Sequence, residues 1–300
     1  MLLNLYRSGT GCVAFALLFL NAAFWVPVLY VAAFFKILIP VRSWRRLWSS
    51  VLVKVSEAWI SGNSLIFNLQ PIDWDIKGLE GLQPKASYFI ICNHQSWVDI
   101  FVLQHIFNRK IPFLRFFLKK QLLYFPGFGL GFWALDFPFM KRYSTKELMA
   151  NPELRAKDME STRKSCERFK GVPVSILSFI EGTRYRPEKH KKQQSPYRHL
   201  LKPKIGGLAF SLEAMGEQFS AVLDVTIVFP LGATQFWDLL TGRIHRIVVR
   251  VSQYGVPKEL LQGCYLNDPV YRQQMKEWVA EIWEGKDKLI EQLNQTQETV

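Results

Sequence analysis

Apolar residues in this chain fall into one long block near the N-terminus and a series of short runs after it. Residues 8–35 carry no charged side chain and are bounded by Arg7 and Lys36. A helix needs about 20 apolar residues to cross a hydrocarbon core of about 30 Å, so the block is long enough to span a bilayer. A secretory signal peptide would have a shorter apolar region followed by small residues. The block therefore predicts a membrane anchor that is retained.

The charges around this block predict its orientation. Arg7 precedes it, whereas four basic residues follow it closely, namely Lys36, Arg42, Arg45 and Arg46. Because cytoplasmic flanks carry the excess of Lys and Arg, the rest of the chain is expected on the cytoplasmic side of a membrane. Pro27 interrupts the block, which leaves open both a spanning helix and a helical hairpin that enters and returns through one leaflet.

From about Pro71 the pattern changes to short apolar runs that alternate with polar helical segments. Four of the runs are typical of buried strands, at residues 85–92, 174–180, 222–229 and 244–251. Helical patterns cover residues 48–65, which follow the anchor, and a charged segment from Ser144 to near Phe169. Strands alternating with helices predict an α/β domain over residues 71–300, with residues 1–70 forming the anchor and the connecting helix.

Two later segments also carry predictions. The last helix begins at Asn267-Asp268-Pro269, an N-cap followed by proline in the first turn. Its apolar stripe is expected to pack on the domain rather than on a membrane, and consists of Met275, Trp278, Val279, Ile282, Trp283, Leu289, Ile290 and Leu293. Residues 121–135 are uncharged but too short and too broken by Pro and Gly to span a bilayer. They form either ordinary core, a membrane-dipping loop or the wall of an apolar tunnel.

Composition narrows the class of protein. Hydrophobic residues make up 49% of the chain and aromatic residues 14%, which excludes a disordered protein. Charged residues make up 21% and the mean hydropathy is only +0.03, which excludes a multi-span membrane protein. The net charge of +13 predicts a surface that attracts nucleic acid, anionic lipid headgroups or a phosphorylated substrate. The four cysteines lie far apart, which argues against a disulfide framework or a structural zinc site.

The candidate chemistry begins where the strand at 85–92 ends. His94 comes two residues later, and open α/β sheets place their working groups at the carboxyl ends of strands. Asp99 can fold back on the imidazole, fix its tautomer and stabilise its protonated form. Such a pair without an obvious serine suggests that the attacking hydroxyl belongs to the substrate. A purely structural histidine is the alternative, and a Cys92 thiolate with His94 as its base is a further formal option.

A second polar group follows the strand at 174–180. In Glu181-Gly182-Thr183-Arg184, glycine lets a ligand approach the backbone closely and arginine can grip a phosphate with two hydrogen bonds. The segment from Arg184 to Lys204 contains eight basic residues and one acidic residue. Behind a membrane anchor, this segment suits a collector of anionic headgroups.

In their order along the chain, these segments resemble the motifs of the lysophospholipid acyltransferases of the 1-acyl-glycerol-3-phosphate acyltransferase (PlsC-type) family. The matching blocks are N-H-x4-D at 93–99, an arginine block at 139–142, E-G-T-R at 181–184, a lysine–glycine segment from Lys204 and a proline block at 228–230. The amino-acid sequence around His94 and Glu181 is most similar to that of the YihG-like bacterial branch. The resemblance implies a glycerolipid acyltransferase-like mixed α/β sheet flanked by helices, with an N-terminal membrane-anchoring helix or helical hairpin.

The resemblance also implies roles for single residues. His94 would be the general base on the sn-2 hydroxyl of 1-acyl-glycerol-3-phosphate, and Asp99 would orient it. The acyl chain would come directly from acyl-CoA or acyl-carrier protein, giving phosphatidic acid, with no metal and no cofactor. The substrates would be bound by Glu181, Gly182, Thr183, Arg184, Arg142, Lys204 and Pro230. Anionic membrane lipids are further expected partners, nucleic acid is not, and the implied location is the bacterial inner membrane with the catalytic domain facing the cytoplasm.

Three departures from the family pattern bear on the acceptor. Met140 and Lys141 adjoin Arg142 in place of the usual neighbours, the spacer at 186–201 is long, and the last block reads Val228-Phe229-Pro230. Two alternatives therefore stay open. One is the same chemistry on another lysophospholipid or on glycerol 3-phosphate. The other is a non-catalytic membrane module that binds anionic lipid or nucleic acid, which would have no use for a positioned base.

Overall fold

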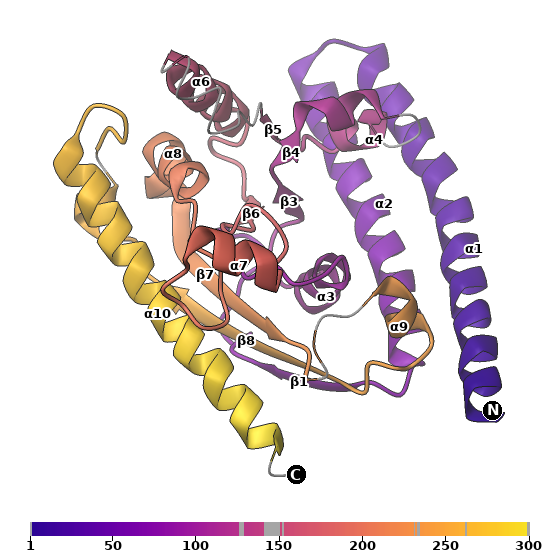
Figure 1. Cartoon of the computed structure of the whole chain (residues 1–300). Coiled ribbons are helices and arrows are strands. Elements are labelled where there is room, and N and C mark those ends of the chain that lie inside the picture. Colours follow the sequence, from indigo (N-terminus) through magenta and orange to yellow (C-terminus); the bar gives the residue numbers. More distant parts are fainter. Residues whose placement is uncertain are drawn as a thin grey trace.

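A mixed sheet of six strands forms the centre of the protein, in a computed structural model that describes residues 2–125, 129–140, 151, 153–230, 232, 235–261 and 263–298 (Figure 1). The strand order is β1-β8-β7-β2-β6-β3. β2 is parallel to β6 and β7, β3 is parallel to β6, and β8 runs antiparallel to β7 and parallel to β1. The strands are β1 (Asp73–Lys77), β2 (Ser87–Cys92), β3 (Leu114–Phe116), β6 (Ser175–Ser178), β7 (Phe219–Val228) and β8 (Arg246–Tyr254).

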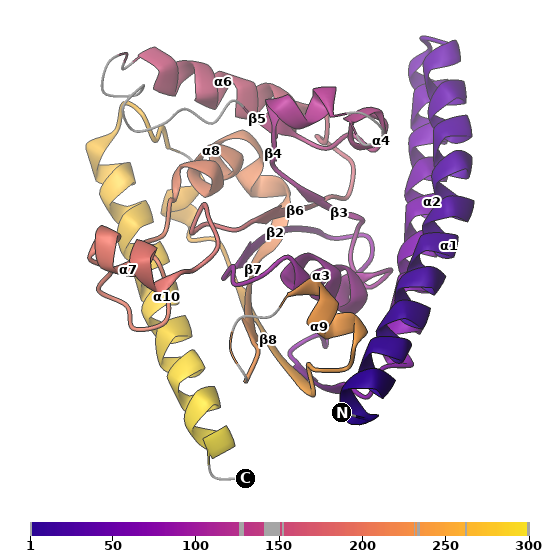
Figure 2. The same ribbon diagram turned by 45° about the vertical axis from the view of Figure 1, so that its right-hand side comes forward.

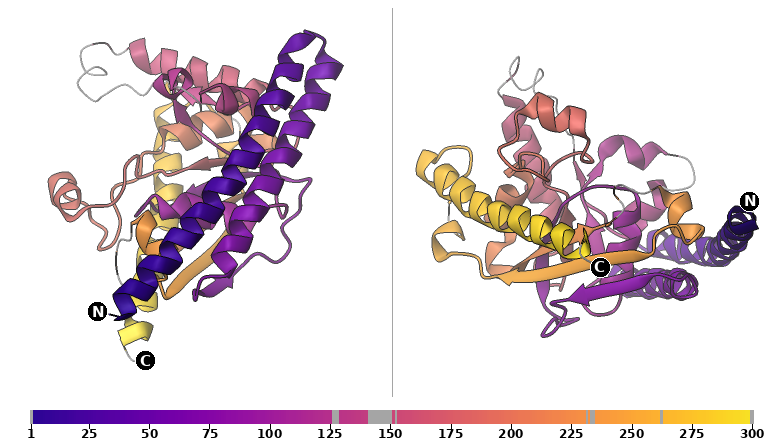
Figure 3. Two further views of the ribbon diagram at one scale, coloured as in Figure 1. Left: turned by 90° about the vertical axis from the view of Figure 1, so that its right-hand side faces the viewer. Right: turned by 60° about the horizontal axis from the view of Figure 1, so that its bottom comes forward.

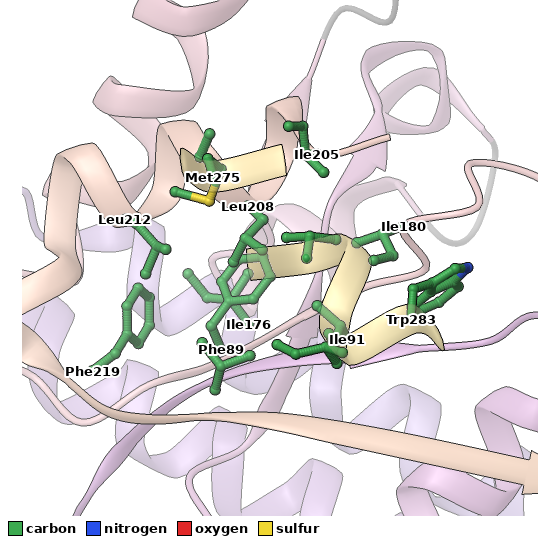
Figure 4. Packing of buried hydrophobic residues seen from close by; sticks show 14 of the residues in the cluster. Phe89, Ile91, Ile176, Ile180, Ile205, Leu208, Leu212, Phe219, Met275 and Trp283 are labelled. Carbon is green, nitrogen blue, oxygen red and sulfur yellow. The ribbon is translucent and has the colours of Figure 1, made fainter. Parts of the chain in front are cut away.

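Helices cover both faces of this sheet, and the alternation of side chains along β2 shows how. Phe89 and Ile91 point into a core shared with α8 and α10, which Figure 4 shows from close by. Tyr88 and Ile90 point into a second core shared with α3 and α9. The helices are α3 (Val98–Phe107), α4 (Gly129–Ala134), α6 (Glu153–Glu167), α7 (Pro187–Gln193), α8 (Gly206–Met215), α9 (Phe236–Leu240) and α10 (Pro269–Glu298), and β4 (Leu118–Lys119) and β5 (Phe139–Met140) form a separate pair.

The N-terminal segment is a helical hairpin that lies along one side of the domain (Figures 2 and 3). α1 (Leu2–Leu38) continues through Pro27, the turn falls at residues 39–41, and α2 (Arg42–Asn68) returns antiparallel to it. The amide of Asn21 joins the two helices by donating to the Trp59 carbonyl and to Asn63 Oδ1, both at 2.9 Å. Asn21 lies so close to Gly62 that a Cβ there would meet its Oδ1 at 2.4 Å. The chain therefore turns after the apolar block and not at Pro27, where the sequence leaves a hairpin open. A polar residue of the block joins the two helices.

Most of the predicted elements are confirmed. The four predicted strands correspond to β2, β6, β7 and β8, although β6 is shorter than its apolar run. α10 begins as expected, because Asp268 Oδ1 accepts the N–H groups of Val270 and Tyr271 at 2.9 and 3.0 Å. Its apolar stripe packs in the core, where Met275, Val279 and Trp283 are fully buried. The stripe therefore faces the domain.

Other segments differ from their prediction. Residues 120–124 form a 3₁₀ turn and α4 follows from Gly129, so the uncharged stretch is not one element. Its C-terminal part, Ala134 and Leu135, is core, whereas Tyr124 is 75% exposed. The predicted start of a charged helix at Ser144 lies outside the described residues, and α6 is described from Glu153. The pattern did not reveal β1 and β3, since β1 is only half-buried and β3 has three residues.

One ion pair is buried between α10 and the sheet. Lys286 has no exposed side-chain surface, donates to the Val225 carbonyl at 2.6 Å and lies 2.8 Å from Asp224 Oδ1. Its Nζ also lies 4.9 Å from the centre of the Trp283 ring. A buried ion pair adds little over an apolar pair, but removing one partner leaves an uncompensated charge.

Lys286→Met is therefore expected to lower the free energy of unfolding by about 3–5 kcal/mol, because Asp224 stays buried without its counter-charge. Denaturant unfolding of the full chain in neutral detergent measures this. Lys288→Met, on the exposed side of the same helix, should change stability by less than about 0.5 kcal/mol. Lys286→Met combined with Asp224→Leu should recover most of the loss. A single Lys286→Met variant as stable as the wild type would contradict this account.

Candidate active site

His94 and Asp99 meet at the carboxyl end of β2. The His94 Nδ1 lies 2.8 Å from Asp99 Oδ2, and the same oxygen accepts the N–H groups of Gln95 and Ser96 at 2.7 and 2.9 Å. Asp99 is fully buried in the first turn of α3, where a helix N-terminus favours its negative charge. Because a carboxylate only accepts hydrogen bonds, Nδ1 carries the proton and Nε2 keeps its lone pair. The arrangement can therefore take up a proton at Nε2.

Neighbouring groups fix the histidine from two sides. The Asn93 side chain donates to the Ile227 carbonyl at 2.8 Å and accepts the Ile227 N–H at 2.9 Å, which ties the end of β2 to β7. The ring of Phe179 stacks on the imidazole, with the ring centres 3.9 Å apart and the planes 17° apart. The His94 side chain keeps 16% of its surface exposed. The ring is thus held in one orientation while still reachable.

Glu181 is a buried link between two backbone segments. Its Oε1 accepts the His94 N–H at 2.8 Å and its Oε2 accepts the Leu201 N–H at 2.9 Å. The residue has no exposed surface, and burial raises its pKa to about 7, against the opposing effect of the two N–H donors and of Lys286. Both oxygens are therefore already occupied by the protein, which differs from the substrate contact that the sequence suggested for Glu181.

α10 supports the segment that reaches Glu181. Trp283 Nε1 donates to the Leu201 carbonyl at 3.0 Å. Asp287 accepts the N–H groups of Arg198 and His199, both at 2.8 Å. Sequence reasoning did not identify Trp283, Asp287 or Lys286 as residues near the site. The one signal was that Lys286 and Asp287 interrupt an otherwise regular apolar stripe.

The other residues of the E-G-T-R block line the same edge of the sheet. Gly182 has a φ of +71°, and a Cβ there would lie 2.9 Å from Lys204 Cδ, so both the backbone and the neighbouring side chain favour glycine. The Lys204 N–H donates to the Ile180 carbonyl at 2.6 Å. Thr183 Oγ1 accepts a hydrogen bond from Lys189 Nζ. The structure thus brings Gly182, Thr183 and Lys204 together, next to the block that holds His94.

Arg184 joins the E-G-T-R block to the N-H-x4-D block through a ring contact. Its guanidinium carbon lies 5.2 Å from the centre of the Trp97 ring, a cation–π distance. Trp97 is 60% exposed, and Arg184 is half-buried. Within the described ranges no carboxylate forms an ion pair with Arg184. Its guanidinium therefore keeps donors for an anionic ligand.

The thiol of Cys92 does not suit a nucleophile. Cys92 is fully buried in β2 and faces the core on the α3 side. Burial raises its pKa well above the usual value for a thiol, so the thiolate is scarce. This leaves the formal option of a cysteine nucleophile without support.

The residues predicted from the sequence that remain are Pro230, Arg142 and the rest of the basic segment at 184–204. Pro230 comes two residues after the end of β7, and β7 is parallel to β2, so Pro230 lies at the same edge as His94. Arg142 lies outside the described residues. The basic segment at 184–204 contains α7, and its Arg198 pairs with Glu291 at 2.6 Å. In the part of the chain that the structure describes, no group of three or more His, Cys, Asp or Glu could hold a metal ion.

The chain belongs to the acyltransferase family, whose pattern it matches over residues 73–230. This range contains His94, Asp99 and the whole E-G-T-R block. The fold is similar to that of a crystal structure of the 1-acyl-sn-glycerophosphate acyltransferase PlsC from Thermotoga maritima, with a TM-score of 0.55 and 16% identity over 94% of this chain and 97% of that one. The mixed sheet expected from the resemblance is thus confirmed.

Curated relatives carry related names. The mouse 1-acyl-sn-glycerol-3-phosphate acyltransferase epsilon is 25% identical over 69% of this chain and 58% of its own length. A 2-acyl-1-lysophosphatidylinositol acyltransferase from Saccharomyces cerevisiae is 24% identical over 71% of this chain and 62% of its own length. The chain thus spans about 60% of the length of these two relatives.

The pKa of Glu181, about 7, predicts a specific pH dependence of stability. Because its folded pKa is raised, the native state holds a proton between about pH 4.5 and 7 that the unfolded state has released. The wild type should therefore lose stability as pH rises through this window, by about 3 kcal/mol relative to Glu181→Gln, which cannot titrate. Unfolding free energies from pH 5 to 8 measure the difference. The exposed variant Glu188→Gln should follow the wild type, and parallel curves for wild type and Glu181→Gln would refute the shift.

Proposed function

We propose that this protein moves a fatty acyl chain from a thioester, acyl-CoA or acyl-carrier protein, to the sn-2 hydroxyl of 1-acyl-glycerol-3-phosphate, giving phosphatidic acid. The observation that carries the proposal is the His94–Asp99 pair at the carboxyl edge of the sheet, with the Arg184 guanidinium over the ring of Trp97, which lies between these two residues in the chain. Membership of the acyltransferase family supports it.

We propose the following reaction, which this geometry supports. His94 Nε2 takes the proton of the acceptor hydroxyl as its oxygen attacks the thioester carbonyl, and Asp99 stabilises the imidazolium that forms. The new ester forms as the carbon–sulfur bond breaks, and the imidazolium returns its proton to the leaving thiolate. A thioester is already activated, so positioning both reactants supplies much of the remaining rate enhancement.

We propose that Arg184 and Lys204 hold the phosphate of the acceptor. Arg184 packs on Trp97 of the N-H-x4-D block and has no ion-pair partner among the described residues. The Lys204 side chain packs against Gly182. Gly182 allows the backbone to come close, Thr183 lies within the same binding surface, and Pro230 shapes its floor. We also propose that Arg142 binds the phosphate from the other side. This assignment rests only on the resemblance of residues 139–142 to the arginine block of the family. Glu181 is given a positioning role, since its oxygens serve the His94 and Leu201 N–H groups.

Attachment to a membrane is the second part of the proposal. One helix is long and apolar enough to cross a bilayer, at Arg7–Leu38, and only 11% of its most apolar window is buried. Its exposed side chains include Phe19, Leu20, Phe24, Val31 and Phe34. We take residues 1–70 as the attachment unit and 71–300 as the catalytic domain, on the cytoplasmic face of a bacterial inner membrane, where the basic flank at 36–46 belongs.

The names of the relatives indicate that a second acceptor should be tested. One relative is named for a lysophosphatidylinositol and another for 1-acyl-glycerol-3-phosphate. Both acceptors carry a phosphate and a free hydroxyl on glycerol, and the same residues would serve both. The same chemistry on another lysophospholipid or on glycerol 3-phosphate is therefore the runner-up.

His94→Ala is expected to lower the rate of transfer by about 10²–10⁴-fold or more, because it removes the general base. The assay uses membranes with the full chain, oleoyl-CoA or oleoyl-carrier protein, and in turn lysophosphatidate, other lysophospholipids and glycerol 3-phosphate. His245→Ala, at an exposed histidine of the segment before β8, should keep wild-type activity.

Three results would count against the proposal in different ways. Turnover by His94→Ala at the wild-type rate would refute the base assignment. Activity confined to another acceptor would support the runner-up. Absence of transfer from both donors to every acceptor would favour the non-catalytic lipid-binding or nucleic-acid-binding module.

A further inference from the structure

A large basic cavity lies at the edge of the sheet opposite to His94. Its volume is about 1280 Å³, and its lining includes Pro84, Phe113 and Pro173, which directly precede or lie just before β2, β3 and β6. These three strands are parallel, so the cavity is at their amino ends whereas His94 is at the carboxyl end. The tip of the α1–α2 hairpin forms another wall, through Arg42, Arg45 and Arg46. This cavity is therefore separate from the candidate active site.

Positive charge dominates the lining. Nine of the lining residues are Lys or Arg and three are Asp or Glu. Two of the acidic residues are already paired, Asp136 with Lys36 at 2.7 Å and Glu167 with Arg163 at 2.6 Å. Over the ranges of the chain described above, Arg45 and Arg46 form no ion pair. The cavity thus has an excess of uncompensated cations.

Arg115 places one of these charges in the interior. The residue is only 7% exposed, its Nε donates to the Leu135 carbonyl at 2.9 Å, and its guanidinium lies between the rings of Phe113 and Phe169, at 5.5 and 5.3 Å. Burial lowers its pKa to about 10, against the opposing effect of the Asp136 carboxylate, which is itself paired with Lys36. Among the described residues no carboxylate forms an ion pair with Arg115. A buried charge without an ion-pair partner of its own is costly, and a bound anion would offset that cost.

The start of α2 adds to the attraction for anions. This helix of 27 residues begins at Arg42 with no side-chain cap and no acidic residue in its first turn. The free N–H groups and the helix dipole therefore present partial positive charge at the mouth of the cavity. Next to the mouth, Leu38, Val41 and Leu47 are each more than half exposed. Cations beside exposed apolar side chains are the features that a lipid headgroup and its chains require.

We propose that this cavity binds the phosphate-bearing headgroup of an anionic phospholipid, independently of catalysis at His94. Arg45, Arg46 and Arg115 contact the phosphate, and the apolar residues at the hairpin tip contact the acyl chains. A soluble polyanion such as a nucleotide would use the cations but leave the apolar tip exposed, so the lipid fits both sets of residues. The bound lipid would stabilise the hairpin against the domain at the membrane surface.

The test measures binding to the purified full chain in neutral detergent by calorimetric titration. The probes are dihexanoylphosphatidylglycerol, its zwitterionic phosphatidylcholine analogue and inorganic pyrophosphate. Arg45→Gln/Arg46→Gln removes two charges at exposed positions of the cavity wall, and Lys276→Gln/Lys288→Gln removes two charges from the exposed side of α10. Melting temperatures without ligand verify that both variants are folded.

The wild type should bind the phosphatidylglycerol saturably and more tightly than either other probe. The cavity variant should weaken this binding by about tenfold or more, through the loss of charge-assisted hydrogen bonds, and the α10 variant by less than about twofold. No saturable binding, an equal loss in both variants, or tighter binding of pyrophosphate would each overturn the proposal. None of these readouts depends on acyl transfer, so the experiment tests the lipid site independently of the proposed function.

Discussion

The buried carboxylate of Glu181 holds the candidate site together. It follows β6, yet its two oxygens accept N–H groups from the end of β2 and from the segment before α8, at His94 and Leu201. A buried carboxylate is costly in free energy unless its hydrogen bonds are made. Moving either segment away would leave one carboxylate oxygen buried without its donor. α10 fixes the second segment through Trp283 and Asp287. The position of the His94 ring therefore depends on contacts that reach from the middle of the chain to its last helix.

Basic residues lie at both edges of the sheet, in a chain whose net charge is +13. At the carboxyl edge, the Arg184 guanidinium lies over Trp97, which follows His94 in the chain, and the Lys204 side chain lies against Gly182. At the amino edge, Arg45, Arg46 and Arg115 line a separate cavity whose lining has nine Lys or Arg residues and three Asp or Glu residues. Between them, α1 exposes an apolar face along the side of the domain. The two anion sites proposed above would thus account for part of the basic composition, beside a helix whose apolar side chains are exposed.

The sequence patterns predicted those features whose interacting residues lie close together in the chain. The apolar runs of β2 and β7, the Asp268 cap of α10 and the five-residue spacing from His94 to Asp99 all act within a few residues, and each is confirmed. β1 and β3 were missed because half-buried or three-residue strands have no distinct pattern. Glu181 was found, but not its partners, since Leu201 and His94 are 20 and 87 residues away. Lys286 and its pairing with Asp224 could not be predicted, because nothing in a helix pattern says which distant strand it meets.

The proposed chemistry requires that Asp99 holds His94 with its proton on Nδ1, so that Nε2 can act as the base. Nitrogen-15 NMR of the full chain with labelled histidine tests this most directly, with His94→Gln used to assign the signal. The account predicts an Nε2 that is unprotonated and an Nδ1 that carries a proton at neutral pH, and it predicts that Asp99→Asn disturbs this pattern. A wild-type His94 with its proton on Nε2 would contradict the claim.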